Sequence, residues 1–193
     1  FNPANSSSFL ITEELYNTIS LEDFFLRRVH EGHSFKQKKY LITKVADLIR
    51  ENPDASDEEL RSSSEEALRN GIDGFVATNT TLKRPVPKNT KSRHAFAQNG
   101  GVSGRPLQER SLEVVSMLYE STNGKVPIVG VGGIDSPDSA WNSLTSGASL
   151  LQLYSALVFR GPSVVSDIVR GLRARVRENG FSGVEEAVGY NNT

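Results

Sequence analysis

Short apolar runs alternate along the chain with longer stretches in which apolar residues recur at helical spacing. The runs 40–46, 73–79, 126–131 and 148–153 are apolar enough to form buried strands. Each run is followed by a stretch with helical periodicity, and this alternation of strands and helices predicts a parallel sheet. No internal repeat accompanies the alternation, and no domain boundary is evident after residue 40.

Serine residues mark the starts of three predicted helices. Ser56 and Glu59 form a capping box before a helix that ends near residue 69. Ser136, followed by a proline, is the predicted N-cap of a helix that ends near residue 147. Ser111 is expected to cap a helix over 111–120, and a last amphipathic helix is expected over 162–178.

Two stretches depart from the strand–helix pattern. Residues 1–39 are assigned to a separate N-terminal segment of loop and short helices, ending in a basic connector. Residues 83–98 contain two prolines, several basic residues and no periodicity, and they predict a long loop. A glycine-rich turn over 100–104 closes this loop and exposes its backbone to a ligand.

The composition narrows the classes of function. The chain has 193 residues, of which 37% are hydrophobic, and a formal net charge of −1. This balance gives no electrostatic reason to expect a nucleic-acid partner. The absence of cysteine excludes thiolate metal sites and cysteine nucleophiles, and His30, His33 and His94 all lie in polar, loop-like surroundings. No metal site is therefore predicted.

Small polar residues and glycines gather at the carboxyl ends of the predicted strands. The run 78–81 consists of hydrogen-bonding side chains, Gly132-Gly133 follows the third strand, and Tyr154-Ser155 follows the fourth. In (β/α)₈ barrels, the loops after the last two strands commonly form a phosphate site. Taken alone, the glycines fit tight turns in two structural βα units equally well.

The count of strands is too small for a closed barrel. A (β/α)₈ barrel typically needs about 250 residues. Four parallel strands leave two apolar edges unpaired, which soluble proteins avoid. We therefore expect further strands, or a partner chain, to cover these edges.

Five motifs resemble the C-terminal half of class 2 (quinone-dependent) dihydroorotate dehydrogenases, which are flavin-containing TIM barrels. They are GIDGFVATNTTLKRP (71–85), GGVSGRPL (100–107), VPIVGVGGI (126–134), GASLLQLYSALVFRGP (147–162) and GFSGVEEAVG (180–189). The likeness is close over 71–189 and weaker over 40–70. It implies an α/β fold in which residues 40–193 carry about the last four βα units of a (β/α)₈ barrel.

The resemblance also implies two groups of binding residues. It assigns the FMN phosphate and ribityl chain to Gly104, Gly133, Tyr154 and Ser155, with Thr78 as a further flavin contact. It assigns the orotate ring to Asn79 and Thr80.

Lys44 is an unusual residue for a strand. Lysine is depleted from strands, so this side chain either extends to solvent at the strand end or faces an anionic ligand. The resemblance favours the second alternative, because the family has a strand lysine beside the flavin. In the family A-P-D follows that lysine, whereas here Pro53-Asp54 appears later. An alternative alignment places Arg50 at the lysine position; it is disfavoured because DLIRENPD is very polar for a buried strand.

The implied reaction is FMN-dependent oxidation of dihydroorotate to orotate with ubiquinone as acceptor, at the mitochondrial inner membrane. The serine base and the quinone tunnel are expected in a missing N-terminal half, so no catalytic residue is assigned to this chain. Two other functions remain open: a non-catalytic structural or interaction subunit derived from a barrel, and another pyrimidine-oxidising flavin barrel similar to dihydropyrimidine dehydrogenase.

Overall fold

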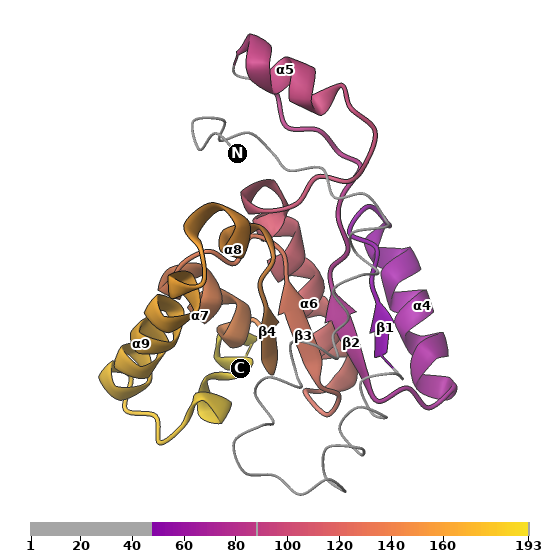
Figure 1. Cartoon of the computed structure of the whole chain (residues 1–193). Coiled ribbons are helices and arrows are strands. Elements are labelled where there is room, and N and C mark those ends of the chain that lie inside the picture. The colour runs from indigo at the N-terminus through magenta and orange to yellow at the C-terminus, as the bar shows by residue number, and fades with distance from the viewer. Residues whose placement is uncertain (1–47, 88, 193) are drawn as a thin grey trace, which may run out of the picture.

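The computed structural model describes residues 48–87 and 89–192. These residues form one parallel four-stranded sheet, in which the order of the strands follows the chain (Figure 1). The strands are β1 (Leu48–Arg50), β2 (Gly74–Ala77), β3 (Ile128–Val131) and β4 (Leu150–Gln152). The predicted parallel sheet is confirmed, and its last three strands lie within the predicted runs.

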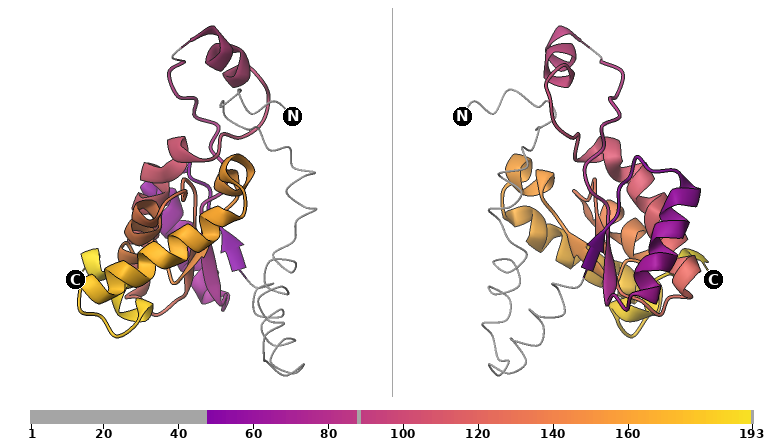
Figure 2. Two further views of the ribbon diagram at one scale, coloured as in Figure 1. Left: turned by 60° about the vertical axis from the view of Figure 1, so that its left-hand side comes forward. Right: turned by 90° about the vertical axis from the view of Figure 1, so that its right-hand side faces the viewer.

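Four longer helices connect or follow the strands: α4 (Asp57–Arg69), α6 (Gln108–Thr122), α7 (Pro137–Thr145) and α9 (Ser163–Glu178). Right-handed crossovers between neighbouring parallel strands put the connecting helices on one face of the sheet. Figure 2 shows this arrangement from two further directions. The shorter helices are α5 (Thr90–Phe96), α8 (Ser155–Arg160) and the 3₁₀ turns Arg105–Leu107, Val184–Ala187 and Tyr190–Asn192. No helix among residues 48–87 and 89–192 is both long and apolar enough to cross a membrane.

Two of the three predicted serine caps are confirmed. Ser56 accepts a hydrogen bond from the Glu59 amide at 3.2 Å, and the Glu59 carboxylate accepts one from the Ser56 amide at 2.8 Å. Ser136 caps α7 in the same reciprocal way with Ser139. Each box satisfies amide groups that a helix start leaves without an intrahelical acceptor.

The prediction that Ser111 caps its helix is wrong. Helix α6 begins at Gln108, because the 3₁₀ turn Arg105–Leu107 leads directly into it. Ser111 is therefore inside the helix and only 3% exposed. Its hydroxyl donates to the carbonyl oxygen of Val131 at the end of β3. This serine joins a helix to the sheet rather than starting the helix.

The first strand also differs from the prediction. Residues 40–46 lie outside the described residues, as does the proposed boundary between 39 and 40. The strand that pairs with β2 is Leu48–Arg50, within the segment that was judged too polar. That judgement is wrong for a physical reason: successive side chains point to opposite faces of a strand. Arg50 lines a pocket, and Glu51, the next residue, points to the opposite face and contacts Ser63 of α4. Each polar side chain therefore has a polar environment of its own, and the segment can form a strand.

Short helices occupy two places where none was predicted. Helix α5 lies inside the predicted loop 83–98, and Figure 1 shows it projecting away from the sheet. Helix α8 follows Tyr154 directly. Both are too short to show an apolar periodicity, which is the signal on which helix prediction from sequence depends.

The hydrophobic core lies between the sheet and the helices. One cluster packs α4 and α6 on the sheet through Leu60, Phe75, Val114, Leu118 and Ile128. A second cluster lies where α7, α8 and α9 meet, and it consists of Ile134, Ala140, Ala156, Val164 and Ile168. Both clusters lie on the helix-covered face of the sheet. Because successive side chains of a strand point to opposite faces, the alternate strand residues point away from the helices.

The strand register defines a row of side chains on that opposite face. Arg50 pairs with Val76, Val76 with Val129, and Val129 with Leu150. The three apolar members of the row lie beneath the carboxyl ends of the strands. Arg50 is the member of this row that lines the cavity at those ends.

Candidate functional site

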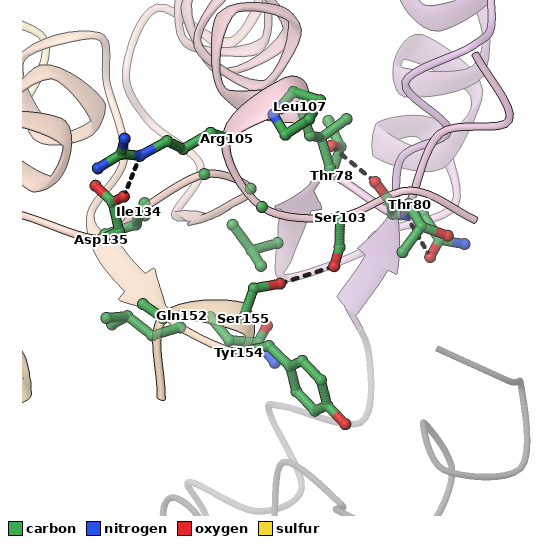
Figure 3. Close-up of a pocket in the computed structure, with 18 of the residues that line it drawn as sticks. Thr78, Thr80, Ser103, Arg105, Leu107, Ile134, Asp135, Gln152, Tyr154 and Ser155 are labelled. Carbon is green, nitrogen blue, oxygen red and sulfur yellow. Dashed lines mark hydrogen bonds and ion pairs between the residues drawn. The ribbon is translucent and has the colours of Figure 1, made fainter. Parts of the chain in front are cut away.

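A cavity of about 440 Å³ lies at the carboxyl ends of the four strands (Figure 3). Its lining includes every predicted site residue that the structure describes: Thr78, Asn79, Thr80, Gly104, Gly133, Tyr154 and Ser155. The remaining predicted site residue, Lys44, lies outside the described residues. Residues from four separate loops therefore meet in one pocket, whose volume is typical of small-molecule sites.

Three loops contribute backbone to this pocket, at Gly104, Gly133 and Tyr154. Among the hydrogen bonds between described residues, none is donated by the backbone N–H of these three residues. Backbone N–H groups gathered in a loop are the kind of donor that binds anions in proteins.

Gly133 is required by packing as well as by any ligand. Its φ angle of +71° is in the left-handed region, and a Cβ atom there would lie 2.4 Å from the Cβ of Gln108. Gly104 differs, because the nearest atom to a Cβ there would be that of Ser155, at 3.5 Å. A larger residue at position 133 would therefore displace α6. A loss of ligand binding in such a variant would not show that Gly133 contacts the ligand.

Ser103 is a site residue that the sequence did not single out. Its hydroxyl lies 2.7 Å from the hydroxyl of Ser155, and Figure 3 shows the two side chains directed at one another across the pocket. This hydrogen bond links the glycine-rich turn to the end of β4. Nothing in the spacing of the two serines, which are far apart in sequence, indicates the contact.

Two arginines at the rim of the pocket are joined through Asp135. The Nε group of Arg105 lies 2.6 Å from the Asp135 carboxylate, and Arg160 donates to the backbone carbonyl of Asp135. Both arginines line the cavity. Guanidinium groups are well suited to phosphate and carboxylate ligands, but Arg105 is paired with Asp135 and Arg160 lies 3.8 Å from Asp167, so their charge is largely balanced within the protein.

The segment after β2 is fixed by hydrogen bonds to its neighbours. The Thr78 amide donates to Val131 at 2.7 Å, and the Asn79 amide donates to the Glu51 carbonyl at 2.9 Å. The Asn79 side-chain oxygen accepts from the Thr80 amide at 2.9 Å. This segment is therefore held between β1 and β3, with its polar side chains at the pocket.

Arg50 brings a cation into the pocket from the end of β1. Burial lowers the pKa of its guanidinium from the ordinary value, but arginine does not lose its proton in proteins. The sequence contained a signal for this residue, because Pro53-Asp54 follows Arg50 and not Lys44 at close spacing. Arg50 therefore lies in the same pocket as the other predicted site residues, and the choice between Arg50 and Lys44 as the flavin cation stays a prediction.

Two buried side-chain oxygens have no hydrogen-bond partner within the described part of the chain. One is the amide oxygen of Gln152, which lines the pocket, and the other is Oε1 of Glu51. Burial raises the pKa of the Glu51 carboxyl, and the hydroxyl of Ser63, 3.5 Å from Oε2, lowers it by a smaller amount. The free oxygen of Gln152 is consistent with a polar ligand in the cavity.

The comparisons with known proteins agree on one family. The profile of the dihydroorotate dehydrogenase family matches residues 13–176. A protein of Rhodospirillum rubrum named dihydroorotate dehydrogenase (quinone) is 46% identical over 142 residues, covering 74% of this chain and 38% of the relative. A protein of the same name from Rippkaea orientalis is 41% identical over 150 residues, covering 75% of this chain and 39% of the relative.

The structural comparison supports the same family. The ligand-free dihydroorotate dehydrogenase of Eimeria tenella matches with a TM-score of 0.69 and 36% identity, over 75% of this chain and 39% of that one. This similarity confirms the expected fold class, in which the four-stranded sheet is part of an α/β barrel. The chain spans about two fifths of the length of the curated relatives it matches.

Proposed function

The chain belongs to the dihydroorotate dehydrogenase family, and from that membership we propose that it is part of an FMN-dependent enzyme that oxidises dihydroorotate to orotate and reduces a quinone. The observation that carries the proposal is the meeting of Thr78–Thr80, Gly104, Gly133 and Tyr154–Ser155 in one cavity. Because the chain spans only part of its relatives, the complete reaction is assigned to the whole protein.

FMN fits the pocket by the chemistry of its lining. The backbone of Gly104, Gly133 and Tyr154 would hold the phosphate, and the rim arginines Arg105 and Arg160 are near enough to exchange their carboxylate partners for it. When bound, FMN supplies the redox chemistry by accepting the electrons of the substrate and passing them on. Thr78, which is 2% exposed, contacts the flavin from the end of β2.

The orotate ring is bound by the side chains of Asn79 and Thr80, which carry amide and hydroxyl groups suited to a pyrimidine edge. The proton acceptor is a serine in the family, and we expect it in the N-terminal half of the barrel. Arg50, which lines the pocket, would supply a positive charge beside bound FMN, and Lys44 is the alternative candidate for this role.

The quinone acceptor places the enzyme at a membrane that contains quinone. The support for a quinone acceptor is that the relatives are named dihydroorotate dehydrogenase (quinone). The mitochondrial inner membrane and ubiquinone stay predictions, because relatives such as that of Rhodospirillum rubrum come from bacteria, which have no mitochondria.

The test combines cofactor binding with turnover in the purified full chain. We expect a yellow protein with flavin absorbance, and dihydroorotate-dependent reduction of a soluble quinone when the other part of the barrel is supplied. If a different dihydropyrimidine reduces the flavin and dihydroorotate does not, the protein is another pyrimidine-oxidising barrel. A colourless protein that co-purifies with other subunits would favour a structural subunit and overturn the proposal.

A charge-reversal variant tests the phosphate site specifically. Ser155→Asp places a carboxylate beside the proposed phosphate, and like charges in contact cost several kcal/mol, so we expect FMN affinity to fall by a factor of about 100 or more. Ser149→Asp, on the exposed residue before β4, is the matched control and should bind FMN normally. Equal FMN affinity in the two variants would remove Ser155 from the site.

A further inference from the structure

We propose that Asp54 is a positioning residue that holds the substrate segment 79–82 against the pocket. The inference rests on the proposed function, because it assigns a role in orotate binding to a residue that does not line the cavity. Asp54 lies in the loop between β1 and α4, and the substrate segment follows β2. The two are far apart in sequence, and they are joined through hydrogen bonds to the Asp54 carboxylate and one from the Asn79 amide to the Glu51 carbonyl.

Both carboxylate oxygens of Asp54 are used by the substrate segment. Oδ1 accepts a hydrogen bond from the hydroxyl of Thr81, and Oδ2 accepts one from the backbone amide of Leu82 at 2.6 Å. Thr81 is only 7% exposed, so its hydroxyl is largely removed from water. Hydrogen bonds to an ionised acceptor are shorter and stronger than those between neutral groups. The aspartate thus fixes the segment at two successive residues.

Asp54 is itself held rigidly by Arg110 of α6. The guanidinium of Arg110 donates to the carbonyl of Pro53 at 3.0 Å and to the carbonyl of Ala55 at 3.0 Å, on either side of the aspartate. The Asp54 amide also donates to the side chain of Asn52 at 3.0 Å. A residue fixed on both sides by a helix is suited to fixing another segment in turn.

The segment held by Asp54 carries the proposed orotate contacts and touches the glycine-rich turn. Thr81 exchanges two backbone hydrogen bonds with Val102, of 3.1 and 2.7 Å. A Cβ atom on Gly101 would lie 2.0 Å from the Thr80 hydroxyl, so Thr80 packs directly on the turn. The position of Thr80 is therefore determined by Asp54 from one side and by Gly101 from the other.

The experiment compares Asp54→Asn and Thr81→Val with the parent full chain. Asparagine keeps the shape of Asp54 but cannot accept at both atoms, and valine removes only the hydroxyl of Thr81. Asp138→Asn is the matched control, since Asp138 in the first turn of α7 pairs with Arg175 of α9 and makes no hydrogen bond to the segment 79–82 among the described residues. Three quantities are measured: amide hydrogen exchange over 78–103, the dissociation constants of orotate and FMN, and the urea midpoint of unfolding.

We expect exchange at Leu82 and Val102 to become at least about fivefold faster in both variants. Loss of a hydrogen bond to a charged group should weaken orotate binding by about tenfold or more. FMN affinity should stay within about threefold, because Asp54 bonds directly to Thr81 and Leu82 and reaches the FMN turn only through the Thr81–Val102 pair. The urea midpoint should fall modestly, by no more than the loss of one charge-assisted hydrogen bond explains. A steady-state KM for dihydroorotate that rises while the quinone KM does not would show the same selectivity.

Two results would overturn the proposal. One is unchanged exchange and unchanged orotate affinity in Asp54→Asn. The other is a loss of FMN affinity as large as the loss of orotate affinity, which would make Asp54 a general structural residue. If the parent protein binds no orotate, the proposed function fails, whereas the exchange rates still decide whether Asp54 holds the segment.

Discussion

Arg50 delivers a permanent positive charge to the pocket from a strand of only three residues. A cation beside a flavin favours its reduced, negatively charged form, because the attraction exists only after the electrons arrive. Arg50 and Lys44 are the two candidates for this role. Arg50 lies in the described pocket, and Lys44 remains a prediction from the sequence.

Removal of the correct cation should lower the reduction potential of bound FMN. A charge-assisted interaction of about 1.5–3 kcal/mol corresponds to about 30–60 mV for a two-electron couple. We expect Arg50→Ala to shift the potential down by this amount and Arg50→Lys, which keeps the charge, to shift it by less than half as much. The potential is measured by dye-coupled titration of the flavoprotein.

Lys44→Ala is the matched comparison for this experiment. If Lys44→Ala lowers the potential and Arg50→Ala does not, the family's strand lysine corresponds to Lys44 and the alternative alignment is wrong. If neither variant moves the potential, the stabilising charge lies elsewhere.

Glu51, the residue directly after β1, is also unusual, because it is only 4% exposed and its Oε1 has no partner in the described chain. Burial raises the pKa of this carboxyl in the folded state. The folded protein therefore binds a proton that the unfolded chain releases, and stability falls as pH rises from the unfolded value, about 4.3, through the folded value. Above that window the penalty is constant.

Glu51→Gln should remove this penalty. The urea stability of the variant, relative to the parent, should improve by on the order of 1 kcal/mol between pH 4 and pH 7.5, because the parent alone pays for burying a charge. Glu58→Gln, on the exposed face of α4, serves as control and should show no such trend. A constant difference between the Glu51→Gln and parent curves at all pH values would show that ionisation of Glu51 is not involved.

Among the helices and strands, boundaries set by local hydrogen bonds were predicted better than boundaries judged from the polarity of a segment. The capping box at Ser56 fixed the start of α4 because both of its hydrogen bonds are made within four residues. The start of α6 was missed because it depends on the preceding 3₁₀ turn, and Ser111 is used instead for a contact with β3. The strand β1 was missed because Arg50 and the following Glu51 made the segment look too polar. Arg50 lines the pocket and Glu51 contacts Ser63 of α4, and neither contact can be read from the local sequence.

The candidate site was more predictable than any single element, because it follows from topology. The carboxyl ends of parallel strands meet at one edge of a sheet, so Thr78, Gly133 and Tyr154 were bound to come together once three strands were recognised. The contacts Ser103–Ser155 and Arg105–Asp135 depend on the exact paths of loops. No pattern in the sequence encodes those paths.

At the scale of the whole molecule, the sheet has two edges to explain. Within the described residues β1 pairs only with β2 and β4 pairs only with β3. The row Arg50, Val76, Val129 and Leu150 ends on β4 with a leucine that is 46% exposed. Unpaired parallel edges with apolar residues tend to pair with other chains, whereas in a closed barrel they meet further strands.

The chain by itself should therefore self-associate through these edges. We expect light scattering after size exclusion to give an oligomer at micromolar concentration, and Leu150→Lys to shift it toward monomer, because a lysine on an edge strand opposes pairing. Val184→Lys is the control: Val184 is exposed to a similar degree, 37%, but lies in a 3₁₀ turn away from the sheet. A monomeric parent chain would mean that its own residues cover the edges, and the description of the sheet as part of a larger barrel would then have to change. An oligomer that responds equally to both lysines would place the contact elsewhere than the β4 edge.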